Sequence, residues 1–176
     1  MSFVGLVSEA QADPRVQALY QQVRENFGFL PNYFQALGRD AQWIEGQLAL
    51  GGAIMKDGAL SRALKEQIGL VVSGINSSSY CIAIHMEILR LLGVEKPLGR
   101  KLVTDYANAP VGEKEKVLFR LADKLTRKPF EILEADVQAV RQAGWDDTAL
   151  VEAVLATAYF NCVNRVSTGL GLVADF

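Results

Sequence analysis

The chain has 176 residues, of which 50% are hydrophobic and 22% are charged, a composition that suits one domain over residues 1–176 with a core of its own. Its formal net charge is −2, with Lys and Arg scattered among Asp and Glu, so we expect neither a nucleic-acid partner nor a membrane partner. No apolar run reaches the roughly 18 residues of a membrane span, and we expect no signal peptide, so we predict a cytoplasmic protein.

Three helices are expected in the first third of the chain. Asp13 followed by a proline is typical of a helix start, and Gly28 closes the apolar pattern that follows. A short apolar helix over residues 33–37 comes next. Asp40 can cap a third helix, in which the pair Gly51-Gly52 leaves the continuity of the helix open.

Ser61 is a good cap for a fourth helix, because an apolar stripe at helical spacing follows it. Another face of this helix aligns a carboxylate with two small residues, which would let a second helix or a ligand approach closely. These residues are Glu66, Gly69 and Ser73.

A fifth helix is expected from Ser79 to about Leu92, because residues 76–79 form a cluster of typical N-cap residues. This helix carries the only histidine, His85, and one of the two cysteines, Cys81. The two residues are four positions apart, so they lie one turn apart on one face. Apolar residues share that face, and we expect both side chains to point inward.

The second half of the chain predicts four more helices and no strand. The last one is apolar on most sides, so it should be central, and Cys162 is expected within a buried stripe of it. The fold class predicted is therefore all-α, a bundle of eight or nine helices. The four ranges are Leu98–Tyr106, Gly112–Arg127, Leu133–Ala143 and Thr148 to about Leu170.

Cys81 is the candidate nucleophile. It lies within a turn of a helix start, where free backbone N–H groups and the helix dipole favour a thiolate. His85 and Glu66 could move protons, because a short connection would pack their two helices antiparallel. Each residue also has a structural interpretation: a small core residue for Cys81, a satisfied core histidine for His85 and a solvated helix residue for Glu66.

The sequence gives only weak indications of a metal, phosphate or carboxylate site. The chain has neither a C-x-x-C nor an H-E-x-x-H pattern, so we expect no metal and no other cofactor. The glycines near residues 51 and 170 lack the spacing of a phosphate loop and are expected to pack or cap helices. Asn161 and Arg165 lie one turn apart and could bind a substrate carboxylate or cap a neighbouring helix, with the structural role favoured.

The residues around Cys81 carry a resemblance to a known family. Glu66 stands twelve positions before Ser78, which opens the run Ser78-Ser79-Tyr80-Cys81-Ile82-Ala83-Ile84-His85. This arrangement resembles the E-x11-C-x-x-C-x-x-x-H signature of the AhpD-like alkylhydroperoxidase and carboxymuconolactone decarboxylase superfamily. Two flanking runs are similar to its peroxidase-related branch: Phe27-Gly28-Phe29-Leu30-Pro31-Asn32 and Asn161-Cys162-Val163-Asn164-Arg165.

The resemblance implies roles for three residues and an assembly. In such proteins the second cysteine of the pair attacks the peroxide, and the glutamate and the last histidine relay protons. These roles would fall to Cys81, Glu66 and His85. The resemblance also implies an AhpD-like all-helical fold that assembles into homotrimers or hexamers.

The chain departs from the family pattern at two positions. Ser78 stands where the first cysteine would be, and serine cannot form a disulfide. Tyr80 stands where some members carry another histidine. These departures leave three alternatives. The protein is a one-cysteine peroxidase whose Cys81 is reduced by an external thiol, it uses Cys162 as a resolving thiol, or it has lost peroxidase chemistry. The expected burial of Cys162 disfavours the second outcome.

The leading prediction is a thiol-dependent peroxidase. Cys81 would attack a hydroperoxide, His85 and Glu66 would handle protons, and a small or protein thiol would restore Cys81. One alternative is a cofactor-free, lactone decarboxylase-type enzyme that uses the acid and base without the thiol. Another is a non-catalytic, oligomeric ligand-binding member of the family.

Overall fold

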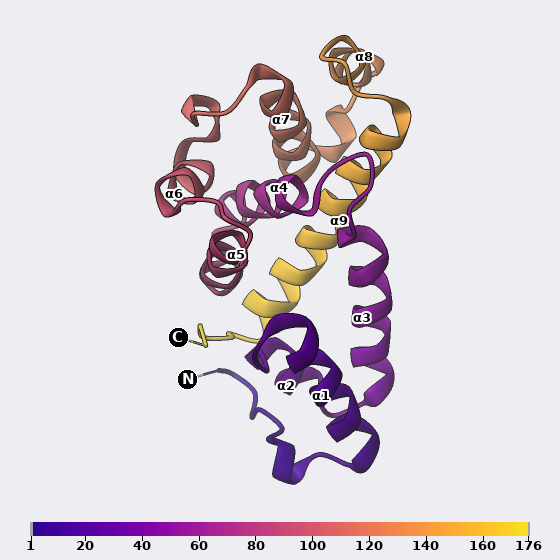
Figure 1. Ribbon diagram of the computed structural model, residues 1–176, viewed down its shortest axis with the longest axis vertical. Helices are drawn as coiled ribbons and strands as arrows, with labels where there is room; N and C mark the ends of the chain where they lie inside the picture. The colour runs from indigo at the N-terminus through magenta and orange to yellow at the C-terminus, as the bar shows by residue number, and fades with distance from the viewer. Residues whose placement is uncertain (1, 176) are drawn as a thin grey trace.

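The computed structural model describes residues 2–175, and within that range the chain forms nine α-helices and no strand (Figure 1). The all-α prediction is therefore confirmed. The helices are α1 (Pro14–Phe27), α2 (Asn32–Leu37), α3 (Ala41–Met55), α4 (Arg62–Ile75), α5 (Ser79–Leu91), α6 (Lys96–Asp105), α7 (Glu113–Arg127), α8 (Glu134–Gln142) and α9 (Asp147–Gly169). Three short 3-10 helices join them: Glu9–Gln11, Tyr106–Asn108 and Pro129–Glu131.

Side-chain caps mark the start of four of the helices. Asp13 accepts hydrogen bonds from two backbone N–H groups of α1, and Asp40 accepts one from α3. Ser61 and Asp146 do the same for α4 and α9. Each cap satisfies an N–H group that has no partner within its helix. The cap positions in the sequence therefore located the helices to within about two residues.

The glycine pair does not interrupt α3. Gly51 is where Tyr159 of α9 approaches, because a Cβ atom built on Gly51 would lie only 2.7 Å from the Tyr159 hydroxyl. Glycine lowers helix stability by roughly 0.5–1 kcal/mol relative to alanine, so its presence inside a helix calls for a packing reason. The expectation that these glycines serve packing is confirmed at Gly51.

The core consists of two clusters of buried residues. One lies among α4, α6, α7, α8 and the first half of α9. The other joins α1, α2, α3 and α5 to the second half of α9. The helix α4 is buried on most sides and packs against α5, α6, α7 and α9. Because α9 contributes to both clusters, it has the central place that its apolar sequence predicts.

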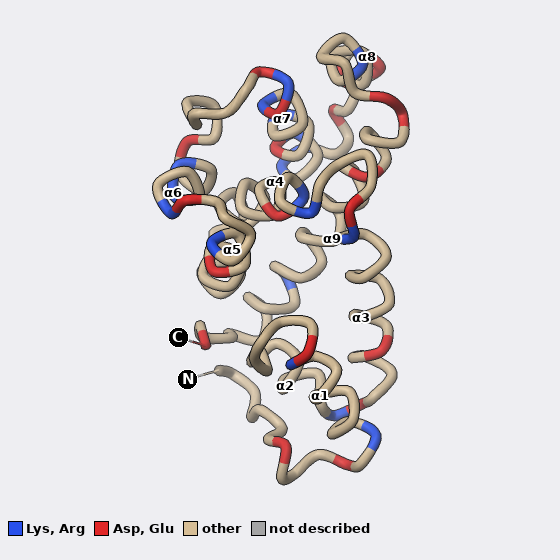
Figure 2. Tube along the Cα trace, in the orientation of Figure 1, with Lys and Arg blue, Asp and Glu red and all other residues tan. Residues whose placement is uncertain are grey.

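The helix α9 runs from α8 toward α2, and the end of α3 meets it near its middle (Figure 1). The two ends of the described chain lie close together, since the Phe3 N–H donates a hydrogen bond to the Leu170 carbonyl over 3.0 Å. Both α6 and α7 carry Lys and Arg together with Asp or Glu (Figure 2). Within residues 2–175, none of the helices combines the length and the hydropathy required to span a membrane.

Candidate active site

The hairpin of α4 and α5 brings two of the predicted residues into contact. The turn at residues 76–78 reverses the chain, and Ser77 takes a left-handed backbone conformation with φ of 52°. The helix α5 then packs back along α4, so that His85 Nδ1 lies 2.7 Å from Glu66 Oε2. Glu66 is only 2% exposed, so its interpretation as a solvated surface residue is wrong.

This contact sets the tautomer of the imidazole. An ionised Glu66 can only accept hydrogen bonds, so Nδ1 of His85 donates to it and Nε2 carries no proton in the neutral ring. Nε2 is then free to take a proton from a substrate or a thiol. The pair has the arrangement of a general base held in orientation by a carboxylate.

The helix α9 holds the imidazole from one side. The ring of Phe160 packs edge to face on the ring of His85, with centroids 4.7 Å apart. Phe160 comes this close because residue 69 of α4 is glycine, where a Cβ atom would lie 2.3 Å from the Phe160 ring. The prediction that Gly69 lets another helix approach is confirmed. Ser73, on the same face, accepts a hydrogen bond from Asn164 of α9.

A cavity of about 450 Å³ opens in front of the pair. Its walls come from the end of α1, from α2 and α3, from the loop before α4, and from α4, α5 and α9. Apolar side chains form much of the surface, among them Phe34, Met55 and Ile88, while Glu66 and His85 supply polar groups. A mostly apolar cavity of this size with a few polar groups is typical of a small-molecule site.

Cys81 is buried, and its side chain is not part of the cavity wall. It is the third residue of α5, so its predicted position near a helix start is confirmed. The residue is 1% exposed, and its sulfur is 3.5 Å from the hydroxyl of Ser167 on α9, to which the thiol donates. Within residues 2–175 no hydrogen bond joins this sulfur to His85 or Glu66.

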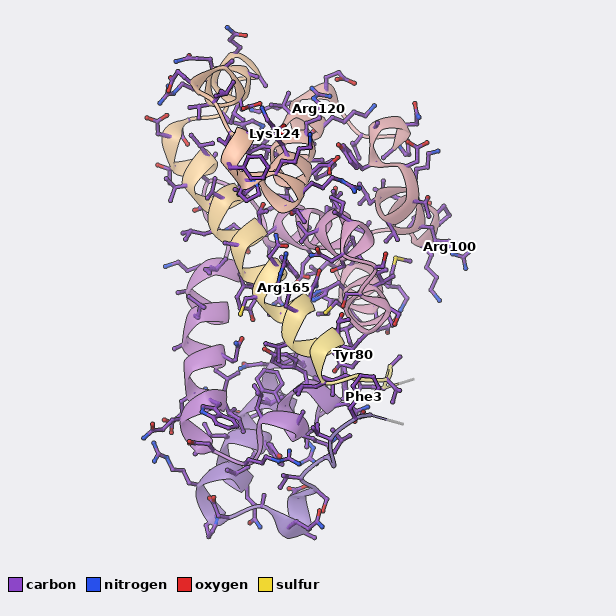
Figure 3. All side chains as sticks on the ribbon, turned by 180° about the vertical axis from the view of Figure 1, so that it is seen from behind. Phe3, Tyr80, Arg100, Arg120, Lys124 and Arg165 are labelled. Carbon is purple, nitrogen blue, oxygen red and sulfur yellow. The ribbon has the colours of Figure 1, made fainter. Side chains whose placement is uncertain are left out.

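Within residues 2–175, neither Ser78 nor Tyr80 has a hydrogen bond to His85 or Glu66. Ser78 occupies the N-cap position of α5, but its side chain makes no capping hydrogen bond, which corrects the expected capping role of residues 76–79. Its hydroxyl instead accepts a hydrogen bond of 3.4 Å from Thr168. The hydroxyl of Tyr80 accepts a hydrogen bond of 3.0 Å from the backbone N–H of Tyr33. Figure 3 shows Tyr80 beside the end of α9.

Cys162 is exposed, so the expectation that it lies in a buried stripe of α9 is wrong. The physical reason is that α9 is apolar on most of its circumference, so periodicity alone could not identify the buried face. In the structure one apolar stripe of α9 stays uncovered within residues 2–175. It contains Val151, Val154, Leu155, Ala158 and Cys162.

Asn161 and Arg165 lie outside the cavity. Asn161 accepts a hydrogen bond of 3.0 Å from Asn76, which caps the end of α4, and donates one to Thr126 of α7. Arg165 donates to the carbonyl and side-chain oxygens of Asn161 and is exposed on α9 (Figure 3). These contacts match the structural role: Asn161 ties α9 to the end of α4 and to α7, and Arg165 bonds to Asn161 within α9.

Several residues of the site were missed from the sequence. Tyr159, Gln47 and Arg62 line the cavity, and Nε of Arg62 lies 3.8 Å from Oε1 of Glu66. The spacing of Arg62 and Glu66, four residues apart on one helix, was a signal that could have identified Arg62. Tyr159 and Gln47 come from helices far apart in sequence, and no local pattern marks them.

The described part of the chain contains no group of three or more His, Cys, Asp and Glu side chains placed to hold a metal ion. Burial, followed in importance by the nearby Glu66, raises the pKa of Tyr159 to about 12. This hydroxyl therefore keeps its proton at neutral pH. The cavity thus holds a base, a carboxylate and a hydroxyl donor. Its other polar lining residues are Asn26, Gln47, Lys56, Asp57 and Arg62.

Comparison with known proteins identifies relatives. A family model described as the carboxymuconolactone decarboxylase family matches residues 41–97, which include α3, α4 and α5. The structure of a peroxidase-related protein from Silicibacter sp. TM1040 is 30% identical, with a TM-score of 0.89, and the match covers 98% of this chain and 91% of that one. Among curated proteins none matches the chain.

Two further solved structures share the fold. A peroxidase-related protein from Ralstonia eutropha JMP134 with an alkylhydroperoxidase AhpD core is 25% identical, with a TM-score of 0.91 and coverage of 99% of this chain and 92% of that one. The debrominase Bmp8, in complex with 2,3,4-tribromopyrrole, is 17% identical, with a TM-score of 0.84 and coverage of 98% and 91%. At that identity the debrominase shows a common fold alone.

Proposed function

The chain belongs to the AhpD-like and carboxymuconolactone decarboxylase superfamily, and from this membership we propose that it is a thiol-dependent peroxidase that reduces organic hydroperoxides at Cys81. The observation that carries the proposal is the 2.7 Å contact between His85 and Glu66, one turn along α5 from the sulfur. Two relatives that share almost the whole chain are peroxidase-related proteins, which supports a peroxidase activity for this chain.

The proposed reaction balances with an external thiol as reductant. His85 takes the proton of Cys81, and the thiolate attacks the terminal oxygen of the hydroperoxide, forming an S–O bond as the O–O bond breaks. The leaving alkoxide takes the proton back from His85 and becomes an alcohol. One external thiol then displaces water from the sulfenic acid, forming a mixed disulfide, and a second thiol releases Cys81 as a thiol.

The reductant is external in this proposal because residue 78 is a serine. A serine cannot form the disulfide that a cysteine at this position would form with Cys81. Cys162 is exposed on α9, whereas Cys81 is buried. Because the two sulfurs have different surroundings, Cys162 is not taken as the resolving thiol. A small thiol or a protein thiol is therefore the proposed source of electrons.

Trapping of the sulfenic acid tests the proposal. We expect cumene hydroperoxide to convert Cys81 to a sulfenic acid that dimedone captures, and mass spectrometry to place the adduct at residue 81. Cys162→Ser should give the same adduct, and Cys81→Ser should give none at that position. Turnover of hydroperoxide by Cys81→Ser at the rate of the unmodified protein would disprove the proposed nucleophile.

A specific observation favours a second candidate. The cavity is lined by His85 and Glu66 but not by Cys81, whose sulfur is covered and hydrogen-bonded to Ser167. A cofactor-free acid–base enzyme, such as a lactone decarboxylase-type enzyme, would need only the base and the carboxylate at the cavity. This candidate predicts a reaction that survives Cys81→Ser and is lost in His85→Ala.

A further inference from the structure

Tyr159 faces the same cavity as the His85–Glu66 pair. It lies on α9, next to Phe160, and its ring packs edge to face on the Phe160 ring with centroids 5.8 Å apart. Phe160 in turn packs on His85, so three rings form a continuous row along the cavity wall. The position of the phenol is therefore coupled to the position of the base.

The Tyr159 hydroxyl has no hydrogen-bond partner within the part of the chain that the structure describes, although it lies in a largely buried region. Gly51 of α3 lies beside it and also lines the cavity. The hydroxyl reaches this place because Gly51 has no side chain, as a Cβ atom there would approach it to 2.7 Å. A polar hydrogen that is held in place and unpaired is free to donate to a ligand.

The electrostatic surroundings keep this hydroxyl protonated. Burial is the largest influence that raises the pKa of Tyr159, and the charge of Glu66 is the next. A thiolate at Cys81 would raise it further, so the sulfur lies within electrostatic range of the phenol. At neutral pH the group is a donor and not a base.

We propose that Tyr159 donates a hydrogen bond to the substrate oxygen on which negative charge develops during the reaction. This inference deepens the proposed function and depends on it for the identity of that oxygen. In hydroperoxide reduction it is the oxygen that remains on the organic group when the O–O bond breaks. Tyr159 keeps its proton throughout, and His85 supplies the proton of the product alcohol. A fixed donor at a developing charge stabilises the transition state more than the ground state.

The cavity lining suits the organic hydroperoxide of the proposed function. The phenol and the imidazole provide one donor and one proton carrier, whereas Phe34, Met55 and Ile88 provide an apolar surface. A substrate that satisfies both parts is an organic hydroperoxide with an apolar body, of which cumene hydroperoxide is a probe. Hydrogen peroxide has no apolar body and would leave that surface unused.

Tyr33 provides a matched control. Its hydroxyl is also buried and has no hydrogen-bond partner, and its pKa is also raised, chiefly by burial. Charges on Cys81 and Cys162 act on it as they act on Tyr159. Tyr33 does not line the cavity, however, so its hydroxyl cannot meet a ligand there.

The first experiment compares Tyr159→Phe with Tyr33→Phe in the reduction of cumene hydroperoxide by a monothiol. We expect kcat of Tyr159→Phe to fall about tenfold to a hundredfold with a small change in KM, as for removal of a single transition-state donor. Tyr33→Phe should keep the kcat of the unmodified protein. Equal kcat for Tyr159→Phe and the unmodified protein would overturn the inference and leave the proposed function standing.

A second variant moves the hydroxyl without removing it. Gly51→Ala places a methyl group against the Tyr159 oxygen, so the phenol must shift. We expect kcat to fall in the same direction as for Tyr159→Phe, but less. Gly46→Ala is the control, because a Cβ atom at Gly46 on the same helix meets nothing within 4 Å. Loss of activity in both glycine variants would argue against a role of the hydroxyl position.

A binding measurement separates this inference from the proposed function. Cumyl alcohol, the product of cumene hydroperoxide, is titrated into the Cys81→Ser protein with and without Tyr159→Phe. Binding that weakens about fivefold to tenfold in Tyr159→Phe supports the donor even if the unmodified protein turns over no hydroperoxide. Binding that is unchanged by Tyr159→Phe, or that is not detected with Tyr159 present, overturns it.

Discussion

His85 and Cys81 lie one turn apart on the same helix, yet their surroundings differ. The side chain of His85 is 13% exposed and faces a cavity, whereas Cys81 is 1% exposed and is covered by Ser167 of α9. The spacing of four residues predicts a common face of α5 but not a common access to solvent. Access depends on where α9 crosses α5, which is a tertiary feature.

This difference separates the two candidate functions. A base at the cavity can act on any ligand that enters. The sulfur of Cys81 is buried outside the cavity lining, so it reacts only with a molecule that reaches it beyond the lining residues. The thiol peroxidase therefore requires a route to Cys81, and the acid–base enzyme does not. Substitution of His85 or Cys81 alone therefore distinguishes the two candidate functions.

Removal of the two central groups has the largest expected effect. Cys81→Ser should abolish reduction of cumene hydroperoxide, because an alcohol is a far weaker nucleophile than a thiolate. His85→Ala should lower kcat/KM about a hundredfold to ten-thousandfold, as for loss of a general base. Steady-state assays of both variants with a monothiol reductant give the comparison. Activity lost in His85→Ala but retained in Cys81→Ser would replace the peroxidase by the acid–base enzyme.

Glu66→Gln alters the support of the base and leaves its ring in place. The amide still meets Nδ1 of His85 but loses the negative charge that orients the ring and stabilises an imidazolium. We expect kcat to fall about tenfold to a hundredfold, as for other partners of a functional histidine. Glu87→Gln, on the exposed side of α5, is the control and should leave kcat unchanged.

Glu152→Gln tests the loop that forms one wall of the cavity. The carboxylate accepts hydrogen bonds from the N–H groups of Ala59 and Leu60 and pairs with the buried Lys65 at 3.0 Å. The amide would leave Lys65 without its counter-charge. We expect a loss of about 2 kcal/mol in the free energy of unfolding at neutral pH, at the lower side of values for buried pairs because Glu152 is partly exposed.

The loss in Glu152→Gln should depend on pH. Burial works to raise the pKa of Glu152, but hydrogen bonds from Leu60, Lys65 and Ala59 together lower it from its ordinary value of 4.5. The stabilisation is therefore complete above 4.5 and disappears as the pH falls through the lowered value. Urea unfolding at neutral pH and well below 4.5 should show the deficit shrinking, and a constant deficit would contradict this explanation.

Ser167→Ala should make the sulfur of Cys81 more accessible. The substitution removes the hydroxyl that meets the sulfur of Cys81, a contact worth about 1 kcal/mol, so labelling of Cys81 by maleimide should become about fivefold faster. The measurement is made in a Cys162→Ser background, because Cys162 is exposed and would react first. An unchanged labelling rate would show that other side chains limit access to the sulfur.

Gly52→Ala has the smallest expected effect. Gly52 lines the cavity and a Cβ atom there touches nothing within 4 Å, so one methyl group should narrow the cavity without strain. We expect at most about a fivefold loss of kcat/KM for cumene hydroperoxide and no loss for hydrogen peroxide. Gly46→Ala should affect neither, and both variants should gain roughly 0.5–1 kcal/mol in stability from the helix interior.

Much of the fold could be predicted because its signals are local. Asp13, Asp40, Ser61 and Asp146 stand before apolar periodic stretches, and each caps a helix in the structure. The contact between Glu66 and His85 could also be predicted from the sequence. The two residues lie on successive helices with a short connection, which leaves antiparallel packing as the simplest arrangement.

The rest of the site could not be predicted because it depends on α9. That helix is apolar around most of its surface, so periodicity could not show that Cys162 is exposed or that Ser167 covers Cys81. The cavity forms where α3 and α9 meet α4 and α5, and Tyr159 comes to it from a position more than 70 residues after His85. Such long-range packing leaves no pattern in a short window of sequence.

The position of Tyr159 and Phe160 also sets when the cavity can exist during synthesis. The hairpin of α4 and α5 leaves the ribosome early, but Phe160 and Tyr159 emerge some 70 residues later. A nascent chain that lacks α9 would therefore hold the base without the wall that encloses it. Binding competence should arise only at the last step of folding, when α9 docks.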